Sequence, residues 1–473
     1  MANSYIRASY ALRAARRLLV SPKPHPVARQ LHGTAIQCTD GVYPALTEMR
    51  VKTPYIEALR HRRDEKGTSH SEKPPTDRDV SPKKMSQSFH RVVLPLAQDQ
   101  WLLDSYLNAT GDIRLGTLFM DLDALSGVIA YKHTGESVMT VTAAIDRITI
   151  NHRLKEICDL ELSGQVTFAT GRSSMEISLQ VAKAPAEGQE VKDEDVMMTC
   201  AFTMVSLDPS TKKAVPVSPL KVETAKEREI FELGEQNYKS KKALAQTTLR
   251  KQTPNDEESD LIHAMWLRQL DYHDPNLPIR KPDNLIYMDT TKVHSSQIMQ
   301  PQYRNRHNFM IFGGFLLKQT FELAFCCCAS FSHSRPTFVS LDPSTFENPV
   351  PVGSVLYMTA TVAYTEPLLP PSGSSTDSSD TTSGARPNQT RVQVRVDSKV
   401  RNVEHGETKP TGQFNYTFLV DQDIKVTPRT YSEFMIWVDA RRRAERVTAS
   451  LRGVDKTLHG DNRDDGKGAG ITE

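Results

Sequence analysis

A long apolar segment followed by a series of strand-like runs occurs twice in the chain. Residues 118–131 and residues 315–331 are both rich in apolar side chains and contain few residues that break helices. A helix that is apolar over most of its surface is expected to be buried. The repeated order predicts two units of one α+β fold in tandem. The strand-like runs lie at residues 138–150, 160–170, 175–184 and 196–207, and again at residues 337–341, 355–364, 392–400 and 414–420.

The first-half strands indicate how the sheet is covered. Between Leu160 and Phe168, polar and apolar side chains largely alternate. Alternation of period two is typical of an antiparallel sheet with one face on the core and one face in water. It places Leu160, Leu162, Val166 and Phe168 on the apolar face. A short strand at residues 89–96 is expected before the first helix, and a strand pair or one bent strand at residues 285–299 before the second.

Changes in composition divide the chain into segments. A stretch rich in Lys, Glu, Ala and Gln at residues 224–250 indicates an exposed helix between the halves, and residues 256–270 a second one. A stretch rich in Ser, Thr, Pro and Gly interrupts the second sheet and is expected to be disordered. The expected organisation is a targeting segment (1–40), a connector (41–87), domain 1 (88–222), a helical linker (223–281), domain 2 (282–425, with the insert at 368–389) and a C-terminal helix with a charged tail (426–473).

Composition supports an ordinary globular protein without a nucleic-acid partner. The chain has 473 residues, which is too long for one hydrophobic core and suits two domains. Its net charge of +2, with no basic stripe carrying interleaved aromatics, gives no electrostatic basis for binding nucleic acid. No apolar stretch is long enough to span a bilayer, because Lys318, Gln319 and Glu322 interrupt the best candidate. A soluble mature protein is therefore expected.

The six cysteines do not form a disulfide or metal-binding pattern. Cys326, Cys327 and Cys328 are consecutive and the other three are scattered, without a further pair at C-x-x-C spacing. A reducing compartment is the simpler interpretation. The cysteine run is interpreted as small apolar packing on a buried helix. No metal site is expected.

The first forty residues differ from the rest of the chain. They contain six basic residues from Arg7 to Arg29, and the first acidic residue is Asp40. Between Tyr5 and Leu19, arginines and apolar residues can occupy opposite faces of a helix. A basic, acid-free, amphipathic N-terminus is typical of a mitochondrial transit peptide, and the alternative is a disordered basic tail. The mitochondrion, and its matrix, is the expected location.

The loops that lead into the two apolar helices carry the most specific patterns. Residues 305–314 read Asn-Arg-His-Asn-Phe-Met-Ile-Phe-Gly-Gly, and residues 115–123 read Leu-Gly-Thr-Leu-Phe-Met-Asp-Leu-Asp. The first pattern, followed on the same helix by Glu322, resembles the hotdog acyl-coenzyme A thioesterases, and the second resembles their partner half. Residues 303–336 look closest to the mitochondrial acyl-coenzyme A thioesterase 9 group. The resemblance covers residues 88–430 and implies two tandem hotdog domains, each an antiparallel sheet wrapped round a long central helix.

The resemblance implies an enzyme that hydrolyses acyl-coenzyme A (acyl-CoA) thioesters in mitochondria. Acyl-CoA would be its partner as substrate, with coenzyme A as part of that substrate and no separate cofactor. Further association of the sheets into a homo-oligomer is also implied. There is no G-x-S-x-G sequence, so a serine nucleophile is not supported.

Glycines at the two helix starts suit the chemistry of thioester cleavage. Attack on a thioester builds negative charge on the carbonyl oxygen, and free N–H groups at a helix N-terminus can stabilise it. Gly116, Gly313 and Gly314 lack a Cβ atom, which allows close approach of substrate to backbone. The alternative is that these glycines only form the turn into each helix.

Asp123 and Glu322 are the candidate catalytic acids. A carboxylate seven residues along a helix lies nearly above its starting residue, and Asp123 stands in that relation to Gly116. Glu322 follows the second glycine of its own helix by eight residues, whereas the family usually keeps seven, so Glu322 is the weaker candidate. The alternatives are an ion pair between Glu322 and Lys318, and a solvated helix face that Asp123 shares with Asp121.

Loop amides are candidates for orienting the attacking water. Asn108 lies eight residues before Gly116, and Asn305 lies eight residues before Gly313. The family places an Asn in this region, with His307 and Asn308 as competitors in the same turn. All four residues are also common in ordinary turns. Asn305 is the preferred choice.

In tandem hotdogs of this family each site lies between the two units. One unit supplies the loop amide and the oxyanion donors, and the other supplies the acid. The preferred site therefore combines Asn305, Gly313 and Gly314 with Asp123, and the reverse site combines Asn108 and Gly116 with Glu322. Arg172 and Arg335 are candidates for binding coenzyme A phosphates. Rival functions are a hotdog hydratase acting on enoyl thioesters and a non-catalytic acyl-CoA-binding or scaffold protein.

Overall fold

The computed structural model of the chain describes residues 43–51, 53–67, 79–151, 156–186, 188–244, 248–249, 251–307, 309–368 and 389–459. Three expectations fall outside these residues. They are the transit peptide at residues 1–40, the disordered insert over residues 369–388, and the candidate Asn308.

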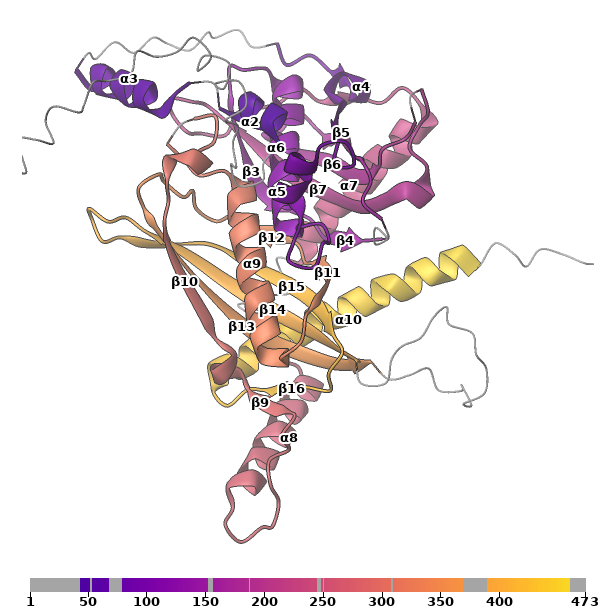
Figure 1. Ribbon diagram of the computed structural model, residues 1–473, viewed down its shortest axis with the longest axis vertical. Helices are drawn as coiled ribbons and strands as arrows, with labels where there is room; N and C mark the ends of the chain where they lie inside the picture. Colours follow the sequence, from indigo (N-terminus) through magenta and orange to yellow (C-terminus); the bar gives the residue numbers. More distant parts are fainter. Residues whose placement is uncertain are drawn as a thin grey trace, which may run out of the picture. The chain divides into compact units, whose positions relative to one another are not determined.

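Two long buried helices form the centres of the two halves, as the apolar pattern predicts. Helix α6 (Leu115–Thr134) and helix α9 (Gly313–Ser332) each span 20 residues. Both begin at a polar loop and lie against the inner face of a sheet (Figure 1). Asp121 and Asp123 are buried on α6, so they do not share the solvated face that was one alternative.

The strands of both halves join into one sheet with a repeated order. The order is β10-β13-β14-β15-β11 in the second half and β4-β7-β6-β5-β2 in the first. The halves join where β11 pairs with β4, through Ser340 with Thr149 and Leu341 with Ile148. This repetition confirms the α+β prediction of two tandem sheets, each wrapped round its own helix. The strands are β2 (His90–Leu94), β3 (Met139–Ile145), β4 (Ile148–Ile150), β5 (Leu160–Ala169), β6 (Ser174–Lys183), β7 (Val196–Leu207), β10 (Val293–Ile298), β11 (Thr337–Leu341), β12 (Ser344–Thr345), β13 (Val355–Leu368), β14 (Gln389–Arg401) and β15 (Thr408–Val420).

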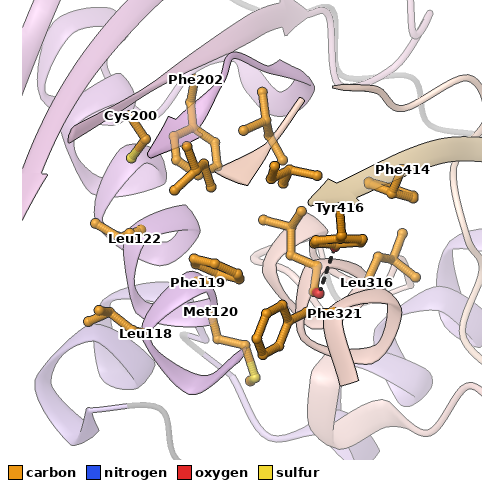
Figure 2. Close-up of a cluster of buried hydrophobic side chains, with 14 of the residues drawn as sticks. Leu118, Phe119, Met120, Leu122, Cys200, Phe202, Leu316, Phe321, Phe414 and Tyr416 are labelled. Carbon is orange, nitrogen blue, oxygen red and sulfur yellow. Dashed lines mark hydrogen bonds between the residues drawn. The ribbon is translucent and has the colours of Figure 1, made fainter. Parts of the chain in front are cut away.

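The two central helices pack directly against each other between the halves. Figure 2 shows Phe119 of α6 and Phe321 of α9 on the facing sides of the helices. Their ring centroids lie 5.3 Å apart in an edge-to-face arrangement, which is a favourable geometry for aromatic pairs. Tyr416 of β15 closes the same cluster, and its hydroxyl bonds to Thr320 at 2.7 Å. The core is therefore continuous across the halves, and residues at the start of one helix can meet residues of the other.

The prediction that the first sheet is covered on one face only is wrong near Phe168. The register of β5 against β6 shifts between Val166 and Phe168, and such a bulge interrupts the alternation of faces. Phe168 consequently packs on helix α7 (Ala225–Leu244), with its ring 4.9 Å from that of Phe231. The outer face is also covered here, because Glu176 on the neighbouring strand bonds to Asn237 of α7.

Helices also occur outside the two halves. The sequence predicts a connector over residues 41–87, and the structure places α2 (Pro44–Arg50) and α3 (Tyr55–Gly67) within it. Leu46 of α2 is fully buried, and the Tyr43 N–H donates to Asp121 of α6 at 2.9 Å. Among the described helices, none has the length and apolarity needed to cross a membrane. The remaining α-helices of the described residues are α4 (Met85–Ser88), α5 (Gln100–Tyr106), α8 (Asp256–His273) and α10 (Tyr431–His459).

Candidate active site

The two helix starts are built in the same way, which allows the helices to be aligned. In the first loop the Arg114 N–H donates to the Tyr106 carbonyl, and in the second the Phe312 N–H donates to the Tyr303 carbonyl. Arg114 and Phe312 are the N-cap residues of α6 and α9.

This alignment assigns a counterpart to each residue of the two helices. Gly116 corresponds to Gly314, and Asp123 corresponds to Phe321. The helix position that carries an acid in the first half therefore carries a phenyl ring in the second. Glu322 is the next residue along and points in a different direction.

Asp123 lies against the N-terminus of the opposite helix. Its Oδ2 atom accepts the Gly314 N–H at 2.6 Å, and its Oδ1 atom accepts the Thr142 hydroxyl at 2.8 Å. The side chain is 5% exposed. A buried carboxylate is stabilised by charge-assisted hydrogen bonds and by the positive end of a helix dipole. Both are supplied across the junction of the halves.

The glycines permit this close approach. A Cβ atom on Gly313 would lie 3.3 Å from both carboxylate oxygens of Asp123. A Cβ atom on Gly314 would lie 2.9 Å from the Asp123 Cβ and 2.9 Å from the Met120 Cα. Real Cβ atoms essentially never make contacts under 3.0 Å. Only glycine fits at position 314 with the helices at this separation.

Asp123 lines a cavity of about 970 Å³ that both halves enclose. Asn305, His307 and Gly313 line it from the second half, as predicted for one composite site. The Asn305 Oδ1 atom accepts the His307 N–H at 3.0 Å, which fixes the amide in the loop. Of the predicted set, Asp123, Asn305 and Gly313 thus line one cavity, and Gly314 donates its N–H to Asp123.

Three further residues of this cavity were missed from the sequence. Thr142 holds the acid, as described above. The Tyr131 hydroxyl lies 2.9 Å from the His307 Nε2 atom, and the Arg306 guanidinium stacks over the Tyr131 ring at 4.5 Å. Tyr131 also accepts the Thr140 N–H at 3.2 Å. Contacts of Tyr131, in the first half, with Arg306 and His307 therefore hold the Asn305 loop in position.

His307 is held in its neutral form. Burial, followed by the charges of Lys212 and Arg306, lowers the pKa of His307 to about 4. The Nε2 atom of the neutral ring can accept a hydrogen bond from the Tyr131 hydroxyl, whereas a protonated ring could not. The hydrogen bond of His307 to Tyr131 therefore helps to hold the Asn305 loop in position at the cavity.

The acid of the reverse site, Glu322, is held in an ion pair. Glu322 forms an ion pair with Arg114, the N-cap residue of the other helix. Asn108 is exposed, and its Oδ1 atom accepts the backbone N–H groups of Thr110 and Asp112 at 2.8 and 3.0 Å. These are the bonds of an ordinary Asx turn. A smaller cavity of about 570 Å³ lies between Asn108 and Glu322, and Gly116 does not line it.

The two candidate phosphate-binding arginines are placed differently. Arg172 lies in the turn between β5 and β6 and donates to the Tyr238 hydroxyl of α7 at 3.3 Å. It lines neither cavity, so its predicted substrate contact is not supported by its position. Arg335 is exposed and lines the smaller cavity.

A sheet wrapped round a central helix, occurring twice in tandem, is the double hotdog fold. Two solved structures are similar to the chain. Acyl-CoA hydrolase from Staphylococcus aureus covers 38% of this chain and 99% of its own at 19% identity, with a TM-score of 0.30. An acyl-ACP thioesterase from Bacteroides thetaiotaomicron covers 70% of this chain and 98% of its own at 10% identity, with a TM-score of 0.36. No protein-family model matches the chain.

Sequence relatives define the family. Mitochondrial acyl-coenzyme A thioesterase 9 of Mus musculus is 31% identical over 399 residues, which is 82% of this chain and 84% of that protein. The Homo sapiens thioesterase 9 is 32% identical over 79% of this chain and 81% of its own. Mitochondrial acyl-coenzyme A thioesterase 10 of Mus musculus is 30% identical over 82% of this chain and 84% of its own. The chain therefore belongs to the acyl-coenzyme A thioesterase family, and the resemblance drawn from its helix starts is confirmed.

Proposed function

We propose that the chain hydrolyses acyl-CoA thioesters to a fatty acid and coenzyme A at one composite site. The observation that carries this proposal is the buried Asp123 carboxylate of the first half, bonded to the N-terminus of α9 in the second half at the wall of the larger cavity. A general base needs a proton donor within hydrogen-bond reach, and a thioester carbonyl needs donors aimed at its oxygen. The Asp123 carboxylate and the first N–H groups of α9 both lie at this cavity.

Asp123 is the proposed general base. Its oxygens accept hydrogen bonds from Gly314 and Thr142, which fix the carboxylate at the wall of the cavity. A water that donates to this carboxylate would be oriented by Asn305. As it attacks the carbonyl carbon, its proton passes to Asp123. The carbon–sulfur bond then breaks, and the coenzyme A thiolate leaves and takes up a proton.

The proposed oxyanion donor is the Gly313 N–H. The sequence favoured Gly314 with a neighbouring N–H, but the Gly314 N–H is occupied by Asp123. The first N–H groups of a helix have no partner within the helix. Gly313 occupies the first position of α9 and lines the cavity. Its N–H can therefore receive the negative charge that develops on the thioester oxygen.

Basic side chains support coenzyme A as the leaving group. Lys132, Lys212 and Arg306 line the larger cavity. Phosphate groups are commonly bound by such residues. Arg306 pairs with Glu136 at 2.7 Å, and Lys132 donates to the Phe89 carbonyl at 3.0 Å and lies 3.1 Å from the His90 Nδ1 atom. Within the described part of the chain, the Lys212 ammonium contacts only the Met139 sulfur, at 3.7 Å, so Lys212 is the stronger candidate.

Location and assembly belong to the same proposal. The relatives named as mitochondrial, together with the basic N-terminal segment, support a mitochondrial location. The homo-oligomer stays a prediction that a measured solution mass would check. A nucleophilic role of Asp123 through an anhydride is the mechanistic alternative. Single-turnover hydrolysis in ¹⁸O-labelled water tests this alternative, because label in the Asp123 carboxylate requires an anhydride intermediate.

The decisive assay traps free thiol during incubation with saturated acyl-CoA esters of increasing chain length. The proposal predicts catalytic release of coenzyme A. Tight binding without thiol release would favour an acyl-CoA-binding protein, and hydration of an enoyl thioester without cleavage would favour a hydratase.

A further inference from the structure

The smaller cavity is the counterpart of the larger one, and three positions of its wall carry phenyl rings in place of smaller side chains. Because α6 and α9 align without a gap, Asp123 and Gly127 of the larger cavity correspond to Phe321 and Phe325 of the smaller one. Each following strand begins at the same distance from its helix, so Thr140 corresponds to Phe338. An acid, a glycine and a threonine are thus replaced by three phenyl rings.

These replacements remove catalysis without filling the space. Phe321 lies near Gly116, where a Cβ atom would be 3.5 Å from its ring, much as Asp123 lies near Gly314. The remaining acid, Glu322, is neutralised by Arg114. A cavity of about 570 Å³ nevertheless persists, which is within the range of small-molecule sites.

We propose that this smaller cavity is a non-catalytic binding site for a linear acyl chain. The chain would lie against Phe321, Phe325 and Phe338, with its anionic head at the mouth near Arg335. Carboxylates of Asp112 and Glu156 also line the cavity, so the head group contributes little and the apolar chain supplies most of the affinity. The ligand class follows from the proposed function, whereas the cavity and its aromatic walls do not depend on it.

The common chemistry is an acyl chain, which can arrive as acyl-CoA or as the released fatty acid. Burial of each added methylene strengthens binding roughly fourfold. The binding affinity is also expected to depend only weakly on salt concentration, because the mouth of the smaller cavity carries charges of both signs.

Cys326 provides a readout that is independent of hydrolysis. It is exposed and lines the smaller cavity, and its counterpart in the larger cavity is Val128. A full-length Asp123→Asn, Val128→Cys variant therefore carries one reporter thiol in each cavity. Alkylation of each thiol is followed by peptide mass spectrometry at increasing concentrations of four- to twelve-carbon acyl-CoA esters or of the matching fatty acids.

Protection of Cys326 that strengthens roughly fourfold per methylene, in either ligand series, supports the proposal. The series that protects at lower concentration identifies the source of the chain. Equal protection by coenzyme A alone would overturn it, and so would unchanged Cys326 alkylation at concentrations that protect Val128→Cys. Absence of thiol release by the wild-type protein would contradict the proposed function and leave these protection results readable.

Discussion

Replacing Gly314 by alanine tests whether the contact between the two central helices sets the catalytic geometry. The added Cβ would lie 2.8 Å from the Phe312 ring, 2.9 Å from the Asp123 Cβ and 2.9 Å from the Met120 Cα. Two of these atoms are on or next to the backbone of α6, so α6 and α9 must separate by about 0.5 Å to regain ordinary contact distances.

Moving α6 and α9 apart changes the stability and the turnover by different amounts. Overpacking of a core costs about 1–3 kcal/mol, and about 1 kcal/mol of that is recovered because alanine favours a helix. The net loss of unfolding free energy is therefore about 0–2 kcal/mol. A misplacement of 1 Å at an active site can lower turnover by roughly a hundredfold, so half that displacement is expected to lower kcat about tenfold.

Gly116→Ala is the matched control, because Gly116 occupies the same position on the other helix. Its nearest new contact is the Lys318 Cγ at 3.2 Å, which is a side-chain atom and lies farther away than the backbone contact of Gly314→Ala. This variant should keep its kcat and gain up to about 1 kcal/mol of stability. Both variants are compared by urea unfolding and by thiol release from acyl-CoA. Equal kcat in wild type and in Gly314→Ala would refute the reasoning.

Two further predictions concern the groups around the acid. Thr142→Val removes the hydroxyl that donates to Asp123 at 2.8 Å, a charge-assisted bond worth about 1.5–3 kcal/mol. In the thiol-release assay the kcat of this variant should fall about tenfold or more, whereas Thr142→Ser keeps the hydroxyl and the wild-type kcat. Equal activity of the two variants would contradict a role for the hydroxyl. The lowered pKa of His307, about 4 in the folded protein against 6.5 as its ordinary value, means that the unfolded chain binds the extra proton first. Its stabilising contribution is therefore complete above pH 6.5 and is lost as the pH falls toward 4. The difference in urea stability between wild type and His307→Gln should shrink over that range, and a pH-independent difference would show that the ring does not titrate in this way.

The sequence predicted most of the fold because the signals are local. The apolar runs marked α6 and α9 to within a few residues, and the repeated order of strands predicted the tandem sheet. The bulge at Phe168 could not be foreseen, since an irregular register depends on the partner strand and on the covering helix.

The candidate site was predictable where it depends on spacing along a helix. The seven-residue interval singled out Asp123 and weakened Glu322, and the structure places a phenyl ring at the counterpart of Asp123. Thr142 and Tyr131 were missed because their contacts with the acid and with His307 form only when strand, helix and opposite loop meet. A Thr in a strand or a Tyr near a helix end carries no such signal in the sequence.

The central claim is that one carboxylate, Asp123, serves a single composite site. The direct test compares kcat for coenzyme A release in Asp123→Asn and Glu322→Gln, with circular dichroism and urea unfolding to verify that both variants are folded. General-base catalysis contributes about 10²–10⁴-fold, so Asp123→Asn should lose activity by that factor while Glu322→Gln keeps most of it. Full activity of a folded Asp123→Asn variant, or an equal loss in Glu322→Gln, would contradict the account.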